Sequence, residues 1–207
     1  MFYLGFSGKI GTGKSTLTQY LITLLDRHDN MNVLKTSFGS ILRKEVSTCY
    51  DIPYYVCASQ EAKAKEFHVS HLPDYLRSPE WGQTATLRQI LQFYGTDVTR
   101  KNDPDYWVKA LDNAVNEADK NSTKGIDIVI VDDIRFPNEK QLIESNGICM
   151  RIQPYEGWQP GSFANHISET ALDDAKFLIK LKPKYGKLEQ TAEEVYSLIF
   201  DILHLNY

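Results

Sequence analysis

The residues with the clearest chemical potential form a glycine-rich loop near the start of the chain. Residues 8–15 read Gly-Lys-Ile-Gly-Thr-Gly-Lys-Ser, between an apolar run over 2–6 and an amphipathic segment over 15–26. Glycines at these positions let successive backbone N–H groups face a polyphosphate, while Lys14 can reach its β- and γ-phosphates and Ser15 can offer a hydroxyl to Mg²⁺. The helix that follows turns its positive end toward the anion. We predict a nucleotide site built by Gly8, Gly11, Thr12, Gly13, Lys14, Ser15 and Thr16.

A second polar group follows another apolar run. Asp132 and Asp133 come directly after the predicted strand over 128–131, which places them at the carboxyl edge of a parallel sheet, where ligands of open α/β folds bind. We predict that Asp133 supports the Mg²⁺ shell or orients a nucleophile. Arg135 could neutralise charge on a phosphoryl group in transfer, because its guanidinium is a planar fork. The ordinary alternatives are a turn carboxylate and a surface ion pair.

The apolar pattern predicts the elements that position these groups. Continuous runs predict strands over 2–6, 31–37, 126–131, 148–152 and 177–181. Helical patterns lie between them, over 15–26, 40–49, 86–94, 104–119, 137–145 and 189–204. This alternation favours an α/β fold of three layers, with a central parallel sheet flanked by helices. We expect a single domain over 1–207, in which two aperiodic segments serve the site: 51–83 as an acceptor-covering insertion and 153–168 as a mobile substrate loop.

Composition limits the partners. The formal charge of −4 and the pI near 5.7 argue against a broad basic face for a nucleic-acid polymer. No apolar run approaches the ~20 residues of a membrane span, and the three cysteines form no C-x-x-C pair. We therefore expect a soluble, cytoplasmic protein with reduced thiols that acts on small nucleotides.

The remaining motifs narrow the class. The N-K-x-D and D-x-x-G motifs of GTPases are absent, which leaves a small-molecule kinase as the leading hypothesis. Four ordered segments resemble the deoxynucleoside monophosphate kinases of tailed bacteriophages, a branch of the P-loop nucleoside monophosphate kinases. The segments are T-L-R-Q-I-L-Q-F-Y-G-T-D at 86–97, D-Y-W-V at 105–108, V-D-D-I-R at 131–135 and H-I-S-E at 166–169.

The resemblance implies a P-loop kinase fold with a lid. It also implies transfer of the γ-phosphoryl group of ATP to a deoxynucleoside monophosphate, with ATP and Mg²⁺ as cofactors. A homodimer is suspected on the same ground, as is a location in the host cytoplasm if the gene is a phage gene.

The resemblance further assigns the acceptor site. Arg88, off the apolar stripe of its helix, would clamp the acceptor phosphate and join Lys14, Asp133 and Arg135 as a catalytic residue. Gly95 and Thr96 would line the acceptor site, and Gly95 would also end the helix as its C′ residue. Trp107 would stack on the base or sugar, unless it is a core residue, and Glu169 would accept hydrogen bonds from the base edge.

The sequence departs from the family pattern at one position and leaves alternatives for the acceptor and the function. Gln153 stands where the family pattern suggests an arginine, so that phosphate clamp is either absent or supplied by Arg43, Lys44 or Arg77. The acceptor could instead resemble phosphomevalonate or dephospho-coenzyme A. A nucleotide-dependent switch module is the alternative from another class.

Overall fold

The computed structural model describes residues 1–29, 31–159 and 166–205. Its contacts divide the chain into two compact units, Met1–Ser37 with Ala114–Tyr207, and Phe38–Asn113. The first unit contains the glycine-rich loop, and the second contains the whole of the predicted insertion over 51–83. The single domain and the acceptor-covering role of that insertion stay predictions.

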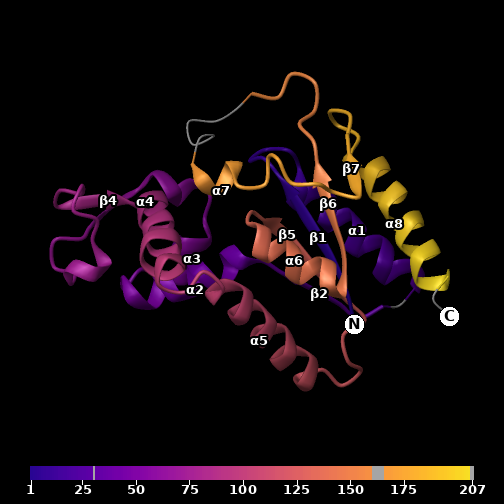
Figure 1. The fold of residues 1–207 in the computed structure, drawn as a ribbon, viewed down its shortest axis with the longest axis horizontal. Helices are drawn as coiled ribbons and strands as arrows, with labels where there is room; N and C mark the ends of the chain where they lie inside the picture. Colours follow the sequence, from indigo (N-terminus) through magenta and orange to yellow (C-terminus); the bar gives the residue numbers. More distant parts are fainter. Residues whose placement is uncertain (30, 160–165, 206–207) are drawn as a thin grey trace. The chain divides into compact units, whose positions relative to one another are not determined.

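The first unit is built on a five-stranded parallel sheet with the order β2-β5-β1-β6-β7 (Figure 1). Its strands are β1 (Phe2–Gly8), β2 (Val33–Thr36), β5 (Ile128–Ile134), β6 (Gly147–Ile152) and β7 (Ile179–Leu181). Each overlaps a run that the sequence predicts as a strand. The α/β class and the central parallel sheet are confirmed.

One strand boundary differs from the prediction. Asp132 and Asp133 lie inside β5 rather than after its end. The reason is a register shift between Gly5 and Ser7 in β1, after which Ser7 pairs with Ile134 and its hydroxyl donates to the Ile134 carbonyl at 2.9 Å. The pairing thus carries β5 three residues further, and the strand ends immediately before Arg135.

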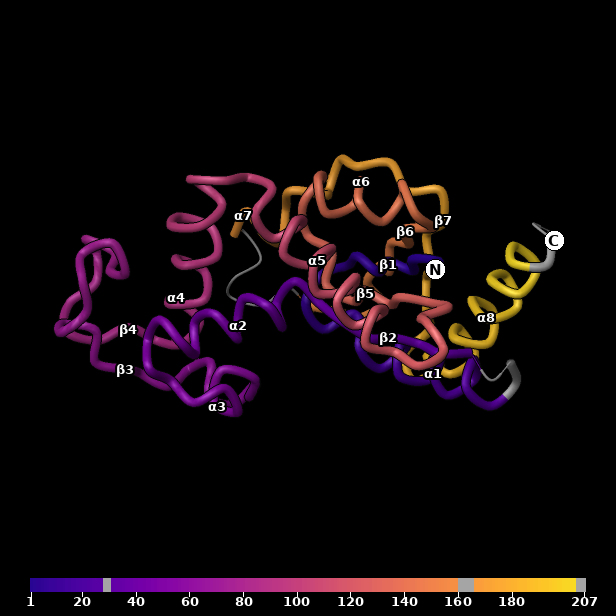
Figure 2. Tube along the Cα trace, turned by 90° about the horizontal axis from the view of Figure 1, so that it is seen from below, coloured from indigo at the N-terminus to yellow at the C-terminus, as the bar shows by residue number. Residues whose placement is uncertain are grey.

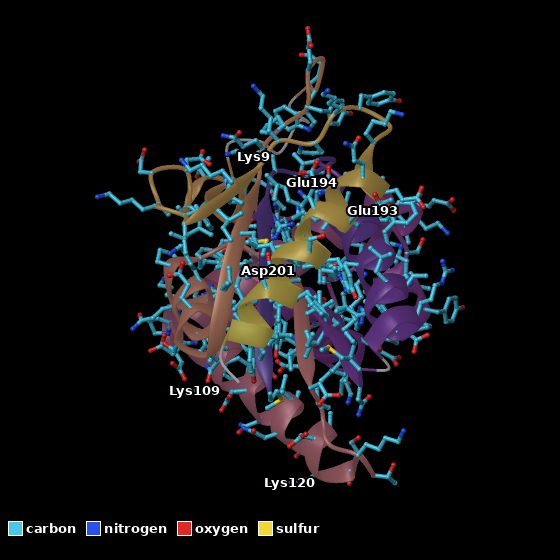
Figure 3. All side chains as sticks on the ribbon, turned by 90° about the vertical axis from the view of Figure 1, so that its right-hand side faces the viewer. Lys9, Lys109, Lys120, Glu193, Glu194 and Asp201 are labelled. Atoms are coloured by element: carbon cyan, nitrogen blue, oxygen red, sulfur yellow. The ribbon has the colours of Figure 1, made fainter. Side chains whose placement is uncertain are left out.

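Helices cover both faces of this sheet. On one face, α1 (Lys14–Asp29) and α8 (Leu188–Leu205) pack against each other and against a fully apolar core. The core contains Leu4, Phe6, Leu17, Leu21, Leu25, Ile128, Ile130, Met150, Ile152, Ala192, Val195 and Ile199. The opposite side of α8 carries the exposed carboxylates Glu193, Glu194 and Asp201 (Figure 3). This division between an apolar and a charged face is the pattern that predicts a surface helix.

The other face of the sheet is covered by α6 (Pro137–Asn146). The helix comes close because Gly5 of β1 has no side chain. A Cβ at this position would lie 2.2 Å from Cδ1 of Ile134 and 2.7 Å from Cγ2 of Ile143. A glycine therefore lets α6 reach the centre of the sheet next to the loop that follows β1.

The second unit is mainly helical (Figure 2). Its elements are α2 (Phe38–Cys49), α3 (Tyr54–Ala58), η1 (Glu61–Ala64), β3 (Glu66–His68), η2 (Asp74–Leu76), β4 (Thr84–Thr86), α4 (Leu87–Gln92), η3 (Phe93–Arg100) and the part of α5 (Tyr106–Asn121) up to Asn113. Strands β3 and β4 form an antiparallel pair. The predicted insertion over 51–83 lacks a long period because it is made of the short elements α3, η1, β3 and η2. They contribute to an apolar core around Val46, Tyr50 and Leu76.

The predicted helix end at Gly95 is wrong. The chain leaves α4 without a break and continues as a π-helical segment, η3, which contains Gly95 and Thr96. Gly95 serves close packing instead, since a Cβ there would lie 3.1 Å from Cδ2 of Leu42 in α2. π-Helical segments are often found at functional sites, because the altered hydrogen bonding frees backbone groups for other partners.

In the part of the chain that the structure describes, no helix has the length and apolar character needed to cross a membrane.

Candidate active site

The glycine-rich loop has a backbone conformation that suits a phosphate cradle. Gly11 and Gly13 adopt φ angles of +79° and +88°, a region that favours glycine. Space is also limited at Gly13, where a Cβ would lie 2.7 Å from Cδ1 of Leu188. The loop is closed by Thr12, whose N–H and hydroxyl both donate to the Lys9 carbonyl, at 3.3 and 2.9 Å. Ser15 and Thr16 follow at the exposed start of α1.

Lys14 curls back over this loop. Its Nζ donates to the carbonyls of Gly8 and Lys9 at 2.7 and 2.8 Å. The pKa of Lys14 is lowered from 10.5 to about 8, chiefly by burial and then by the nearby Arg135 guanidinium, while the carboxylates of Glu169, Asp133 and Asp132 oppose the shift. Lys14, Arg135 and three carboxylates are therefore close enough to interact electrostatically.

The low pKa of Lys14 predicts a pH dependence. Below pH about 8 the ammonium of the free enzyme is charged and can bind phosphate, and above it the charge is lost. We expect kcat/KM for ATP to be level near neutral pH and to decline as the pH rises through about 8. Steady-state kinetics at constant ionic strength would test this, and a profile that stays level up to pH ~9.5 would contradict it.

The two adjacent aspartates have different surroundings. Asp132 is 8% exposed, and its Oδ2 lies 3.3 Å from Nζ of Lys35 in β2. Asp133 points to the other side of the strand, as successive residues do, and is half-buried. Of the two, Asp133 is thus the better candidate for contact with a bound nucleotide.

The oxygen donors suit Mg²⁺. Ser15 offers an exposed hydroxyl and Asp133 a half-buried carboxylate. Among the described residues, no group of three or more His, Cys, Asp or Glu side chains could hold a metal by itself. This fits an ion that is bound through one or two protein oxygens together with phosphate and water.

Arg135 is held at both its backbone and its side chain. Its N–H donates to Oε2 of Glu139 at 2.7 Å, as does the N–H of Phe136 at 3.1 Å. Its guanidinium forms an ion pair with Glu169 and a longer contact of 3.4 Å with the Ser168 hydroxyl. Glu139, 2% exposed, thus orients Arg135 from α6. It is a site residue that sequence reasoning missed, although a glutamate three residues after Phe136 resembles a helix-capping signal.

Glu169 lies beside the phosphate loop. It is 8% exposed and belongs to α7 (Ile167–Thr170). Its Oε1 accepts from Arg135, and its Oε2 accepts from the Ile10 N–H at 3.1 Å. Contact with a base edge would require this carboxylate to exchange partners, so the predicted base-reading role stays a prediction.

The other predicted acceptor residues, Arg88, Gly95, Thr96 and Trp107, lie in the second unit. Arg88 is half-buried in the first turn of α4, which begins with a capping box: the Gln89 N–H donates to the Thr86 hydroxyl at 3.3 Å, and the Thr86 N–H to Oε1 of Gln89 at 2.8 Å. Gly95 and Trp107 are brought together, since the indole N–H donates to the Gly95 carbonyl at 3.0 Å. Thr96 is half-buried.

Trp107 is a core residue of this unit, 3% exposed. Its ring lies 5.0 Å from Tyr106 and 6.4 Å from Tyr94, and both tyrosine hydroxyls donate to Glu45 of α2, at 3.0 and 3.2 Å. A stacking role would require the indole to be uncovered first, and it stays a prediction. Trp107 does orient the Gly95 carbonyl, which the sequence did not reveal.

The proposed substitutes for the missing arginine differ in their surroundings. Arg77 is tied to Asp74 at 2.7 Å and to the Ser70 carbonyl at 3.2 Å. Arg43 has a buried Nε that lacks a hydrogen-bond partner among the described residues. An arginine does occur at the end of β6, two residues before Gln153: Arg151 donates to Ser7 and Asp173. Sequence reasoning overlooked it because it lies inside the predicted strand.

The second predicted loop is described only in part, because residues 160–165 lie outside the described ranges. Its first half reaches the phosphate loop, where the indole N–H of Trp158 donates to the Ile10 carbonyl at 2.9 Å. Its last residue, Ser168, contacts Arg135.

The phosphate loop joins the first strand and the first helix of a parallel α/β sheet, and a lysine, an arginine and carboxylates lie around it. This arrangement defines a P-loop nucleotide-binding protein. The model of the deoxynucleotide monophosphate kinase family matches residues 18–177, and the chain belongs to this family. It is an ATP-dependent phosphotransferase that acts on deoxynucleoside monophosphates. Because the match begins after the phosphate loop, the loop and the family match are separate observations.

Solved structures of other kinases are similar at low sequence identity. Shikimate kinase from Acinetobacter baumannii in complex with shikimate is 10% identical, with 97% of this chain and 94% of that chain covered and a TM-score of 0.43. Shikimate kinase from Bacteroides thetaiotaomicron is 10% identical, with 96% and 98% covered and a TM-score of 0.38. An unliganded sugar kinase from Janibacter sp. is 11% identical, with 99% and 95% covered and a TM-score of 0.40. No curated protein matches the chain in sequence.

Proposed function

We propose that the phosphate loop, Asp133 and Arg135 carry out phosphoryl transfer from Mg-ATP to a deoxynucleoside monophosphate. The observation that carries this proposal is the grouping around Lys14, whose pKa is lowered by burial and by Arg135 against the opposing effect of Glu169 and Asp133. Perturbed pKa values of this kind cluster at functional sites. Here the perturbed group is the lysine of a phosphate-binding loop.

The chemistry requires positioning and charge neutralisation more than proton abstraction, because phosphoryl transfer passes through a loose transition state. Lys14 and the N–H groups of the loop would bind the β- and γ-phosphates, and Arg135 would stabilise the charge on the transferred group. Ser15 and Asp133 would hold Mg²⁺, directly or through water, and the bound ion would neutralise phosphate charge.

The acceptor would be held by the second unit. Arg88 would bind its phosphate through the two parallel hydrogen bonds that a guanidinium can donate. Gly95, Thr96 and Trp107 would line the site, and Glu169 would read the base edge once released from Arg135. Segment 51–83 would close over the acceptor, and segment 153–168 would exclude water that could otherwise hydrolyse ATP. The suspected homodimer stays a prediction.

A coupled ADP-release assay tests this function. We expect turnover with Mg-ATP and one or more of the canonical deoxynucleoside monophosphates, and loss of that turnover when Mg²⁺ is removed with EDTA. Ribonucleoside monophosphates and phosphomevalonate serve as competing acceptors. Activity with phosphomevalonate alone would overturn the acceptor assignment, and slow ADP release that ignores every acceptor would favour a nucleotide-dependent switch.

A further inference from the structure

Asp173 joins two parts of the first unit that are far apart in sequence. Its Oδ2 accepts from Nζ of Lys9 at 2.6 Å. Lys9 lies in the phosphate loop, just beyond the end of β1 (Figure 3). The Oδ1 of Asp173 accepts from Nη2 of Arg151, in β6, at 2.9 Å. One carboxylate oxygen is thus engaged by a cation of the phosphate loop and the other by a cation of β6, the strand that pairs with β1. The catalytic roles proposed above do not use this carboxylate.

The Lys9 branch leads back to the proposed reaction centre. Nζ of Lys9 also donates to the backbone carbonyl of Glu169 at 2.7 Å. The Glu169 side chain in turn binds the Arg135 guanidinium and the Ile10 N–H. The Lys9–Asp173 pair therefore ties the backbone of α7 to the same loop that the Glu169 carboxylate touches.

The Arg151 branch reaches the same point from the other side. Nη1 of Arg151 donates to the Ser7 hydroxyl at 2.8 Å, and Ser7 donates to the Ile134 carbonyl at 2.9 Å. Ile134 immediately precedes Arg135 in the chain. The polar contacts therefore form a closed circuit that begins and ends at Arg135. One branch passes through Glu169 and Lys9, the other passes through Ser7 and Arg151, and Asp173 joins the two.

The energetics favour a positioning role over a stabilising one. The Asp173 side chain is 40% exposed, and its partners Lys9 and Arg151 are 20% and 15% exposed. Ion pairs with such an exposed member contribute little to folding, because solvent screens them. What the circuit does constrain is geometry, because a bound carboxylate and two cations fix the distance between α7, the phosphate loop and β6.

We propose that Asp173 is a positioning residue for phosphoryl transfer. It holds Glu169 against the phosphate loop, and Glu169 sets the orientation of Arg135. The inference rests on the proposed function, since it assumes that Arg135 acts at the reacting phosphates. A small displacement of a charge-stabilising group lowers the rate of the chemical step more than it weakens substrate binding.

The test is Asp173→Asn in the full chain, with Asp174→Asn as the matched control. Asp174 is the adjacent exposed carboxylate, so the control makes the same change in charge. We expect Asp173→Asn to lower kcat with saturating Mg-ATP and deoxynucleoside monophosphate by about ten- to a hundredfold. The dissociation constant for ATP should stay within about twofold and the thermal midpoint should match that of Asp174→Asn, because the ion pair is half-exposed.

A double-mutant cycle separates positioning from a general structural effect. If Asp173 acts through Glu169, Asp173→Asn should add little to the kcat loss of Glu169→Gln, whereas independent effects would multiply. Arg151→Lys is a second variant, which removes the fork between Ser7 and Asp173 and should reproduce the kcat loss.

Two results would overturn the inference, and they are distinguishable. Unchanged kcat in Asp173→Asn, together with a large loss in Arg135→Gln, would remove Asp173 from the mechanism and leave the proposed function intact. Unchanged kcat in Arg135→Gln would instead refute the role that the proposed function gives to Arg135, and the role of Asp173 with it, whereas the function itself is decided by the acceptor assay.

Discussion

Replacing Lys14 with alanine is expected to lower kcat for deoxynucleoside monophosphate phosphorylation by about 10²–10³-fold, the usual effect of removing one donor that stabilises transition-state charge. The ammonium lies within the phosphate loop, 2.7 and 2.8 Å from two of its carbonyls. It is thus positioned to exchange these acceptors for phosphate oxygens when ATP binds. The coupled ADP-release assay at saturating substrates measures the loss.

The same Lys14→Ala variant should be at least as stable as the parent chain near neutral pH. The folded-state pKa of about 8 lies below the ordinary 10.5, so between these values the unfolded chain binds more protons than the folded one. The unfavourable contribution of the charged lysine is fully present below pH about 8 and is relieved as the pH rises toward 10.5. Lys120→Ala, at an exposed position of α5, is the control for removing a positive charge. A lowered thermal midpoint with retained kcat would contradict both expectations.

Replacing Arg135 with glutamine is expected to have the larger effect, lowering kcat by about 10³-fold or more, as the loss of an arginine that neutralises a transferring phosphoryl group does. Glu169 holds the guanidinium of Arg135, and Glu139 holds its backbone N–H. The position of Arg135 is therefore defined before nucleotide binds. Arg135→Lys keeps the charge but not the planar fork, and its kcat should fall between those of the parent and Arg135→Gln.

Measurements of stability distinguish a structural role of Arg135 from a catalytic one. In Arg135→Gln the buried carboxylate of Glu169 loses its charged partner, which should lower the free energy of unfolding by about 1–3 kcal/mol. The double variant Arg135→Gln with Glu169→Gln should recover much of that loss in urea denaturation, because no buried charge remains unpaired. It should not recover kcat. Recovery of both stability and kcat would show that Arg135 is structural only.

The features that could be predicted from the sequence are those whose cause is local. The phosphate loop needs glycines, a lysine and a serine at adjacent positions, so one short segment contains the whole signal. The strands of the parallel sheet are recognisable because burial on both faces demands continuous apolar runs. The start of α4 is likewise local, since Thr86 and Gln89 cap it within one turn.

The features that were missed depend on partners distant in sequence. The extension of β5 to Ile134 follows from pairing with Ser7, 127 residues away. Gly95 has the composition of a helix end, but close packing against Leu42 keeps it inside a continuous helical segment. Neither outcome has a signature within its own stretch of chain.

By itself, the sequence determined that this protein binds a nucleotide on a parallel α/β sheet, and it pointed to the kinase family, because phosphate binding and strand burial depend on neighbouring residues. Only the tertiary structure decided which side chains meet around the loop. Glu169 pairs with Arg135, and Asp173 joins Lys9 to Arg151, across separations of 34, 164 and 22 residues. Such pairs are set by how strands and helices pack, and for charged side chains the partner decides whether a residue supports the fold, the site or neither.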